Sequence, residues 1–256
     1  MNLPRPAYWG KLPAYGDFLR QGAPLDVQQA WRQWLEGPLR EAWLASGLAQ
    51  AHALPWSFVL RPGCLRFSGD RYVAGVYARS QDKFGREHPF LMWFLLAPAS
   101  VSSLLSTHDN PLFCLARLLH GHLAVPGVAA SGVTTSGVAA SGVAASGVTA
   151  SGVTTPRRPA LVDQINRLWR PGRAGVLGAL RRRKDAPDFA AAREWADGWP
   201  SDTREDGLAG VPHAPWRNWP ASVFEDLSQA WYWQQDVQAG YVSFLSVTAA
   251  EPADLA

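Results

Sequence analysis

The sequence predicts an α/β protein, a three-layer α/β/α sandwich around a mixed sheet with a disordered low-complexity insertion. Two observations support this prediction. The run from Pro89 to Leu96 is apolar throughout, which is typical of a central strand covered on both faces. Segments with apolar residues at helical spacing lie before and after the strand-like segments, so helices can cover both faces of the sheet.

The N-terminal elements follow from apolar spacing and from residues that break regular structure. A short strand is expected at residues 8–11. A helix is expected to begin at Asp26, placed at its N-cap in a capping-box-like pattern. Gly37 and Pro38 interrupt that helix, and residues 39–44 resume the helical pattern.

The later elements are assigned in the same way. Four strands are expected in the middle of the chain, at residues 56–60, 64–67, 72–78 and 89–96. Three helices are expected after them, at residues 109–119, 160–169 and 222–229. The apolar segments 231–233 and 241–247 predict a late hairpin.

A low-complexity tract separates two parts of the chain. From Gly127 to Pro156 a five-residue unit that begins Gly-Val recurs six times, without charge or large side chains. A period of five fits neither helix nor strand, so a flexible linker or expanded loop is expected. The expected organisation is therefore a core over residues 1–124, the repeat over 125–158, and the remainder of the same domain over 159–256.

Thirteen tryptophans are many for 256 residues. Indole rings bury a large area, so most are expected in the core. The exceptions lie in a Trp-rich segment among prolines, glycines and charges, where an interface is nearly as plausible: Trp195, Trp199, Trp216 and Trp219.

Composition narrows the function classes. The formal net charge is only +3 and the basic residues are spread along the chain, so no nucleic-acid partner is expected. No apolar run reaches membrane-spanning length and the N-terminus has no secretory apolar segment, so a soluble intracellular protein is expected. Cys64 and Cys114 lack metal-ligand spacing; two buried thiols are favoured, with a disulfide left open.

Two short segments combine Gly, Pro, Asp and basic residues without helical or strand periodicity. They cover residues 9–20 and 75–90 and are expected to form shaped loops between strands. Charged side chains in such loops either pair with one another or contact a partner. The residues singled out are Gly10, Lys11, Pro13, Gly16, Asp17, Phe18, Ser80, Asp82, Gly85, Arg86 and Pro89.

The pattern Gly-Lys-Leu-Pro-x-x-Gly-Asp-Phe, followed by Ser-x-Asp-x-x-Gly-Arg-x-x-Pro, resembles the TagF (ImpM) family of type VI secretion proteins. The resemblance covers roughly residues 8–98. It implies a cytoplasmic, post-translational repressor that binds a forkhead-associated scaffold component of the secretion system. It implies no catalytic residue and no cofactor.

An enzyme is the alternative from another class. Ser80, Asp82 and His88 would supply a hydroxyl, a carboxylate and an imidazole for a hydrolase, although no Gly-x-Ser-x-Gly turn is present. The spacing of Asp17, Asp82 and His88 matches no metal-site signature. A binding protein is the preferred interpretation, and an ion pair between Asp17 and Arg86 is expected to join the two loops.

Overall fold

The structure, a computed structural model, describes residues 3–46, 54–105, 111–123, 160–169, 229–235 and 241–248. Within these ranges a single seven-stranded sheet has the order β2-β1-β5-β4-β3-β6-β7. Its strands are β1 (Ala7–Gly10), β2 (Leu19–Gln21), β3 (Trp56–Leu60), β4 (Tyr72–Ala78), β5 (Phe90–Leu96), β6 (Gln229–Gln235) and β7 (Tyr241–Thr248).

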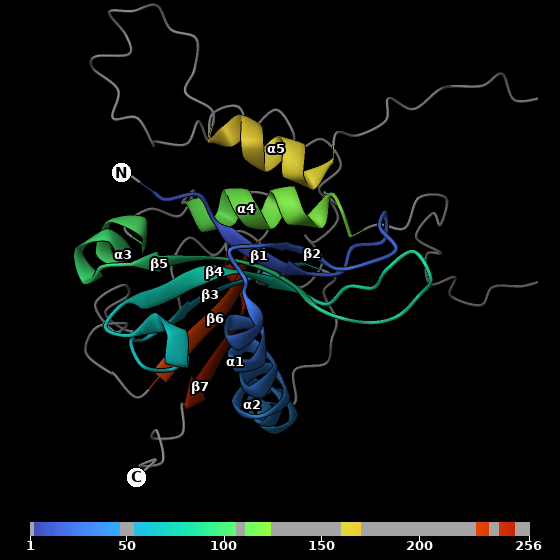
Figure 1. Ribbon diagram of the computed structural model, residues 1–256. Helices are drawn as coiled ribbons and strands as arrows, with labels where there is room; N and C mark the ends of the chain where they lie inside the picture. The colour runs from blue at the N-terminus through green and yellow to red at the C-terminus, as the bar shows by residue number, and fades with distance from the viewer. Residues whose placement is uncertain are drawn as a thin grey trace, which may run out of the picture.

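Helices cover both faces of the sheet, which confirms the α/β sandwich. On one face lie α1 (Leu25–Glu36) and α2 (Pro38–Ser46). On the other lie α3 (Pro98–Leu105), α4 (Pro111–His120) and α5 (Leu161–Leu168). Figure 1 shows the sheet between these two layers, with α4 and α5 above it and α1 and α2 below.

Alternation along the central strands explains the two layers. In β5, Phe90, Met92 and Phe94 join the core under α4 and α5, whereas Leu91 and Trp93 join the core under α1. Trp31 of α1 contacts Trp93 with ring centroids 5.3 Å apart. Successive side chains of a strand point to opposite faces, so an entirely apolar strand fits a doubly covered sheet.

The expected mixed sheet is wrong in one respect, because every strand pair in the described ranges is antiparallel. Several neighbours are joined by short connections, such as β1 to β2 and β4 to β5. A parallel pair needs a crossover of about a dozen residues or more. Strands joined by these shorter connections therefore pair antiparallel. Burial on both faces therefore predicted the layers but not the strand direction.

Other expectations are corrected locally. Residues 64–67 form no strand; they belong to a turn that includes the short 3₁₀ helix η1 (Arg66–Ser68). That turn closes on itself, since Ser68 donates its backbone N–H to Leu65 O and Gly63 donates to Ser68 Oγ. Helix α1 begins at Leu25 with Pro24 as its N-cap, so Asp26 lies in its first turn rather than at the cap. Neither β2 nor α3 was expected.

The remaining elements agree with the sequence-based expectations where they are described. Strands β6 and β7 pair as the late hairpin, and β6 also pairs with β3, so both extend the same sheet. The expected helix over 222–229 lies outside the described residues except for Gln229, which begins β6. The low-complexity insertion at 125–158 and the four tryptophans of the Trp-rich segment also lie outside them. In the described ranges no helix has the length and apolar character that a membrane span requires.

Candidate functional site

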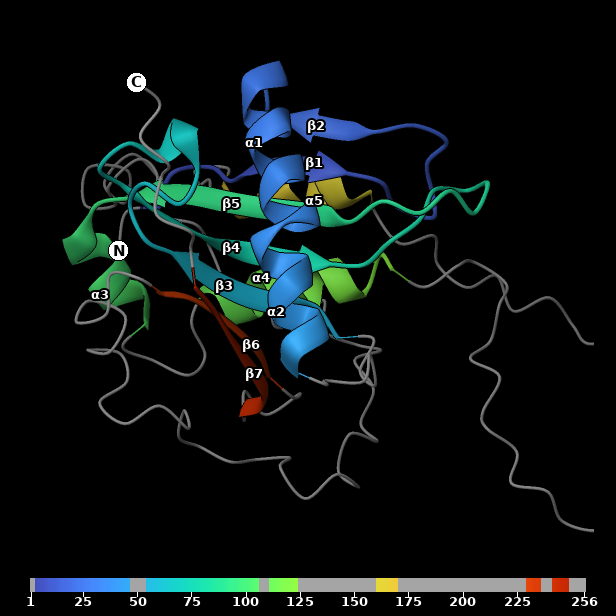
Figure 2. The same cartoon turned by 90° about the horizontal axis from the view of Figure 1, so that it is seen from below.

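The two sequence motifs form adjacent loops at one end of the sheet. Strand β1 pairs antiparallel with β5, with Gly10 opposite Phe90. The loop that leaves β1 (residues 11–18) and the loop that enters β5 (residues 79–89) therefore emerge together, as Figure 2 shows. We call them the paired loops. Sheet register alone brings together motifs that lie about sixty residues apart in sequence.

Glycine permits the close approach of the paired loops. A Cβ atom on Gly10 would lie 2.1 Å from the carbonyl oxygen of Pro89 and 2.6 Å from Phe90 Cα. Gly10 also has φ +143°, which L side chains rarely adopt. A Cβ on Gly16 would lie 2.7 Å from Lys83 Cε, so the tips of the two loops also touch.

Hydrogen bonds hold the paired loops together across their tips. The Lys83 backbone N–H donates to the carbonyl oxygen of Tyr15 at 2.8 Å. The Arg86 guanidinium donates through Nη2 to the carbonyl oxygen of Gly16, also at 2.8 Å. In these two contacts the first loop supplies the carbonyl acceptors and the second loop supplies the donors.

Asp82 is the centre of the paired loops. Its Oδ1 accepts hydrogen bonds from the backbone N–H groups of Phe84 and Arg86, at 2.9 and 3.0 Å. Its Oδ2 lies 2.6 Å from Arg86 Nε and 3.2 Å from Lys11 Nζ. The residue is only 1% exposed, and Lys11 is also buried.

These contacts keep the buried carboxylate ionised. Burial acts to raise the pKa of Asp82, but the backbone and side chain of Arg86, the Phe84 N–H and Lys11 all stabilise the charged form. Their combined effect holds the pKa of Asp82 well below its usual range. Asp82 therefore acts as a charged structural centre with two cationic partners.

The expected pair between Asp17 and Arg86 is wrong. Arg86 pairs with Asp82, four residues earlier in the same loop. Asp17 is exposed, and its Oδ1 accepts a hydrogen bond from the backbone N–H of Phe18 at 2.7 Å. A carboxylate within the same tight loop reaches Arg86 more readily than one across the interface between the loops. The two loops are instead joined by Lys11 with Asp82 and by Arg86 with the Gly16 carbonyl.

An aromatic cluster lies at the base of the paired loops. The His88 ring packs edge-on against Trp9 and Phe18, with centroid distances of 4.5 and 4.7 Å. Phe18 stacks on Trp9 at 5.9 Å, and the Arg32 guanidinium of α1 lies 5.4 Å from the Trp9 ring centroid. Burial lowers the pKa of His88, against the effect of its 2.7 Å contact with the Pro89 carbonyl oxygen.

The three side chains of the hydrolase alternative are not joined. The Ser80 hydroxyl is buried without a hydrogen-bond partner. Both oxygens of Asp82 are bonded to Lys11 and to the backbone and side chain of residues 84–86, and His88 Nδ1 lies 2.7 Å from the Pro89 carbonyl oxygen. In a catalytic triad the nucleophile contacts the base and the base contacts the orienting acid. These three side chains make neither contact.

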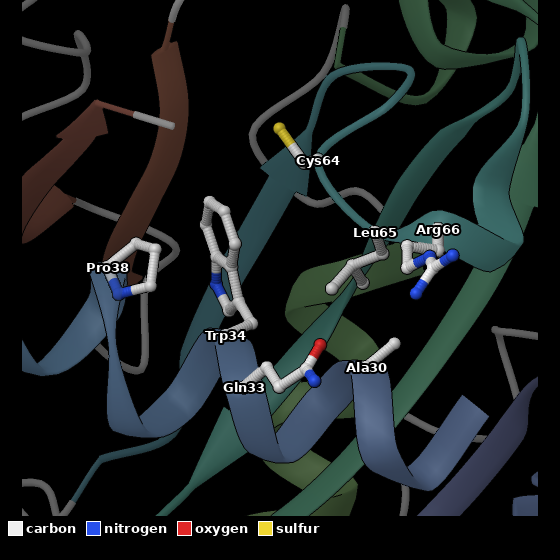
Figure 3. A pocket seen from close by; sticks show the side chains of 7 residues that line it. All are labelled: Ala30, Gln33, Trp34, Pro38, Cys64, Leu65 and Arg66. Atoms are coloured by element: carbon white, nitrogen blue, oxygen red, sulfur yellow. The ribbon is translucent and has the colours of Figure 1, made fainter. Parts of the chain in front are cut away.

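A small cavity lies elsewhere, between α1, the start of α2 and the turn after β3. Its volume is about 140 Å³, and Figure 3 shows its lining residues: Ala30, Gln33, Trp34, Pro38, Cys64, Leu65 and Arg66. Burial raises the pKa of the Cys64 thiol to about 11, despite the opposing charge of Arg61. The thiol is therefore protonated near neutral pH and poorly nucleophilic. In the described part of the chain, no three His, Cys, Asp or Glu side chains are grouped to hold a metal ion.

The structure accounts for each of the residues singled out in the sequence. All eleven lie in or beside the paired loops: Gly10, Lys11, Pro13, Gly16, Asp17, Phe18, Ser80, Asp82, Gly85, Arg86 and Pro89. Sequence reasoning missed the exposed Phe84 at the loop tip and the contribution of Arg32 from α1. Phe84 lies inside the second sequence motif, and an aromatic residue between Lys83 and Arg86 could have indicated a contact surface. Nothing in the sequence relates Arg32 to Trp9.

The fold and the site define a class of protein: an α/β/α domain with two surface loops that are held together by hydrogen bonds. Residues 7–124 match the family model of the TagF N-terminal domain, described as type VI secretion system-associated. The chain therefore carries a TagF N-terminal domain, as the loop motifs predicted.

A comparison with solved structures also finds similar proteins. The chain is 18% identical to the protein in a crystal structure of PA0076 from Pseudomonas aeruginosa PAO1, over 96% of this chain and 90% of that one. The TM-score is 0.35, which is too low to establish a common fold. No curated protein matches the chain in sequence.

Proposed function

We propose that this protein is a non-enzymatic, cytoplasmic regulator that represses a type VI secretion system after translation. It does so by stoichiometric binding to a forkhead-associated scaffold component of that system. The observation that carries the proposal is the TagF N-terminal domain match, which spans the residues that form the paired loops. Fold alone does not give function, so the assignment to secretion depends on that match.

The geometry of the paired loops supports a binding role. The ion pairs of Asp82 with Lys11 and Arg86 stabilise the conformation of the paired loops. Exposed aromatic rings on that shape, Phe18 and Phe84, are the kind of side chain that anchors a protein partner. A surface that is fixed before binding loses little conformational entropy when the partner docks.

Genetic and binding experiments test the proposal together. Deleting the gene in a strain with an intact secretion cluster is expected to raise secretion without changing transcript levels, and overproduction is expected to silence it. A tagged wild-type protein is expected to retain the forkhead-associated protein in a pull-down at near-equal stoichiometry. Unchanged secretion after deletion, together with no retained scaffold, would refute the proposal.

A chemical test separates binding from catalysis. Ser80→Ala and His88→Ala remove the nucleophile and the base of the hydrolase alternative, and they leave the Asp82 contacts in place. Both variants are expected to repress secretion in the deletion strain. Turnover of an ester or amide substrate by the wild type that Ser80→Ala abolishes would establish an enzyme instead.

A further inference from the structure

The tip of the paired loops combines an exposed aromatic ring with two cations. We propose that Phe84, Lys83 and Arg86 form the docking surface for an acidic segment of the partner protein, with Phe84 as its apolar anchor. This inference rests on the proposed function only in assuming that the protein acts by binding. It adds where the partner binds and what chemistry it presents.

Phe84 is exposed, yet its backbone is held in place. The residue is 67% exposed, so most of the ring is open to a partner. Its own N–H donates to Asp82 Oδ1, and the following residue, Gly85, donates its N–H to the Asp82 carbonyl oxygen. The N–H of Arg86 also donates to Asp82 Oδ1. The loop thus presents the ring in a fixed position, which lowers the entropy that a partner must overcome.

The charges around Phe84 are arranged with cations outward and the anion inward. Lys83 Nζ lies 4.8 Å and Arg86 Cζ 5.3 Å from the Phe84 ring centroid. The Arg86 side chain is 60% exposed, whereas that of Asp82 is completely buried beneath it. The exposed Glu87 of the same loop is offset by Arg79 at 3.8 Å, so a partner that approaches the ring meets the cations Lys83 and Arg86. Carboxylates on that partner would complement both cations.

The surface extends from the tip along the first loop. Phe18 is 37% exposed and stacks on Trp9. Lys11 Nζ lies 5.1 Å from the Phe18 ring centroid. Arg32 of α1 lies 5.4 Å from the Trp9 ring centroid. Of these residues Phe18 and Arg32 are exposed, whereas Trp9 and Lys11 are buried beneath the surface. Asp17 is the exposed carboxylate of the first loop and limits the positive field on that side.

The size of this surface favours a protein segment over a polyanion. Nucleic acids and anionic membranes are held by many cations along one face, each adding a small increment. Here two exposed cations flank a single aromatic ring, and the net charge of the whole chain is only +3. A short segment that combines acidic and apolar side chains matches both the charge and the ring.

The test compares the loop tip with matched positions elsewhere on the full chain. Phe84→Ala is paired with Leu44→Ala, because Leu44 is an exposed apolar residue (75%) on α2. Lys83→Glu is paired with Arg71→Glu, because Arg71 is exposed and precedes β4, at the opposite end of that strand from the paired loops. The probe is the purified forkhead-associated protein of the same secretion cluster, titrated at 50 mM and 500 mM salt.

Phe84→Ala is expected to weaken binding by about thirtyfold, in the range of an aromatic interface anchor. Lys83→Glu is expected to weaken it strongly at low salt and much less at high salt, because screening suppresses interactions between exposed charges. The two control variants are expected to bind within about twofold of the wild type, since surface changes away from an interface contribute little. Unchanged thermal unfolding of all four variants excludes misfolding as the cause.

The outcomes separate this inference from the proposed function. A wild type that binds, with Phe84→Ala and Lys83→Glu binding equally well, overturns the docking surface and leaves the proposed function intact. A wild type that does not bind refutes the proposed partner. In that case the docking surface is tested by measuring secretion in a deletion strain complemented with Phe84→Ala. Repression as full as that by the wild type would overturn the docking surface. Binding of the wild type to duplex DNA or anionic vesicles that Lys83→Glu abolishes would reassign the surface to a polyanion.

Discussion

Gly10 provides the sharpest test of how tightly the paired loops are joined. Replacing Gly10 with Ala introduces two costs. The first is conformational, because φ +143° is unfavourable for an L residue, by roughly 1–2 kcal/mol. The second is steric, because the new Cβ would lie 2.1 Å from Pro89 O and 2.6 Å from Phe90 Cα. Backbone atoms cannot rotate aside, and overpacking of this kind adds about 1–3 kcal/mol.

Gly63 supplies the matched control. It also has positive φ, +83°, but a Cβ there would meet nothing within 4 Å, so Gly63→Ala carries the conformational cost alone. We therefore expect Gly10→Ala to lower the free energy of unfolding by roughly 2–5 kcal/mol and Gly63→Ala by about 1–2 kcal/mol. Urea denaturation followed by tryptophan fluorescence measures both. If Gly10→Ala is no more destabilising than Gly63→Ala, the close approach of β1 to the start of β5 is wrong.

Three further predictions concern single side chains. Because the pKa of Asp82 is lowered on folding, its charge stabilises the protein above the unfolded-state pKa of about 4, and this stabilisation is lost as pH falls further. Asp82→Asn should therefore lower the unfolding temperature at pH 7 and flatten its acid dependence below pH 4. Asp17→Asn should leave the unfolding temperature at pH 7 nearly unchanged, because Asp17 is exposed. Tyr232→Phe should lower the free energy of unfolding by about 1–3 kcal/mol, because it leaves the buried indole N–H of Trp34 unpaired; urea denaturation checks this. Cys64, whose pKa is about 11, should react with iodoacetamide at pH 8 far more slowly than the unfolded chain does; equal rates in a mass-spectrometric time course would contradict the burial of the thiol.

Local sequence patterns predicted most of the elements because their signals are local. The apolar run that became β5 and the Gly37-Pro38 break between α1 and α2 were both read correctly. The short strand β2 was missed because three half-exposed residues carry no periodicity. Residues 64–67 were misread as a strand because their apolar content outweighed the turn residues on either side. Strand direction was mispredicted because side-chain burial on two faces is the same in parallel and antiparallel sheets.

The candidate site shows the same division. The motifs identified the two loops, and most of the residues that build them, from their Gly, Pro and Asp content. The predicted partner of Arg86, Asp17, was wrong because nothing in the sequence distinguishes Asp17 from Asp82. Only Asp82 lies where two backbone N–H groups, Arg86 and Lys11 converge. Which carboxylate becomes buried depends on the loop backbone, which is held by hydrogen bonds within residues 80–88 and by contacts with the other loop.

The sequence by itself determined the layered α/β class, the position of the two loops and the family to which their motifs point, because periodicity and turn chemistry act over a few residues. The tertiary structure alone decided that β1 lies beside β5, that Asp82 and not Asp17 receives the charge of Arg86, and that Phe84 faces outward from a locked loop. The pairing of β1 with β5 joins residues about eighty positions apart, whereas the Asp82–Arg86 pair and the position of Phe84 depend on hydrogen bonds within residues 82–86. The physical reason is that long-range register is set by how well whole faces of the sheet are buried, a property that no short segment of the chain contains.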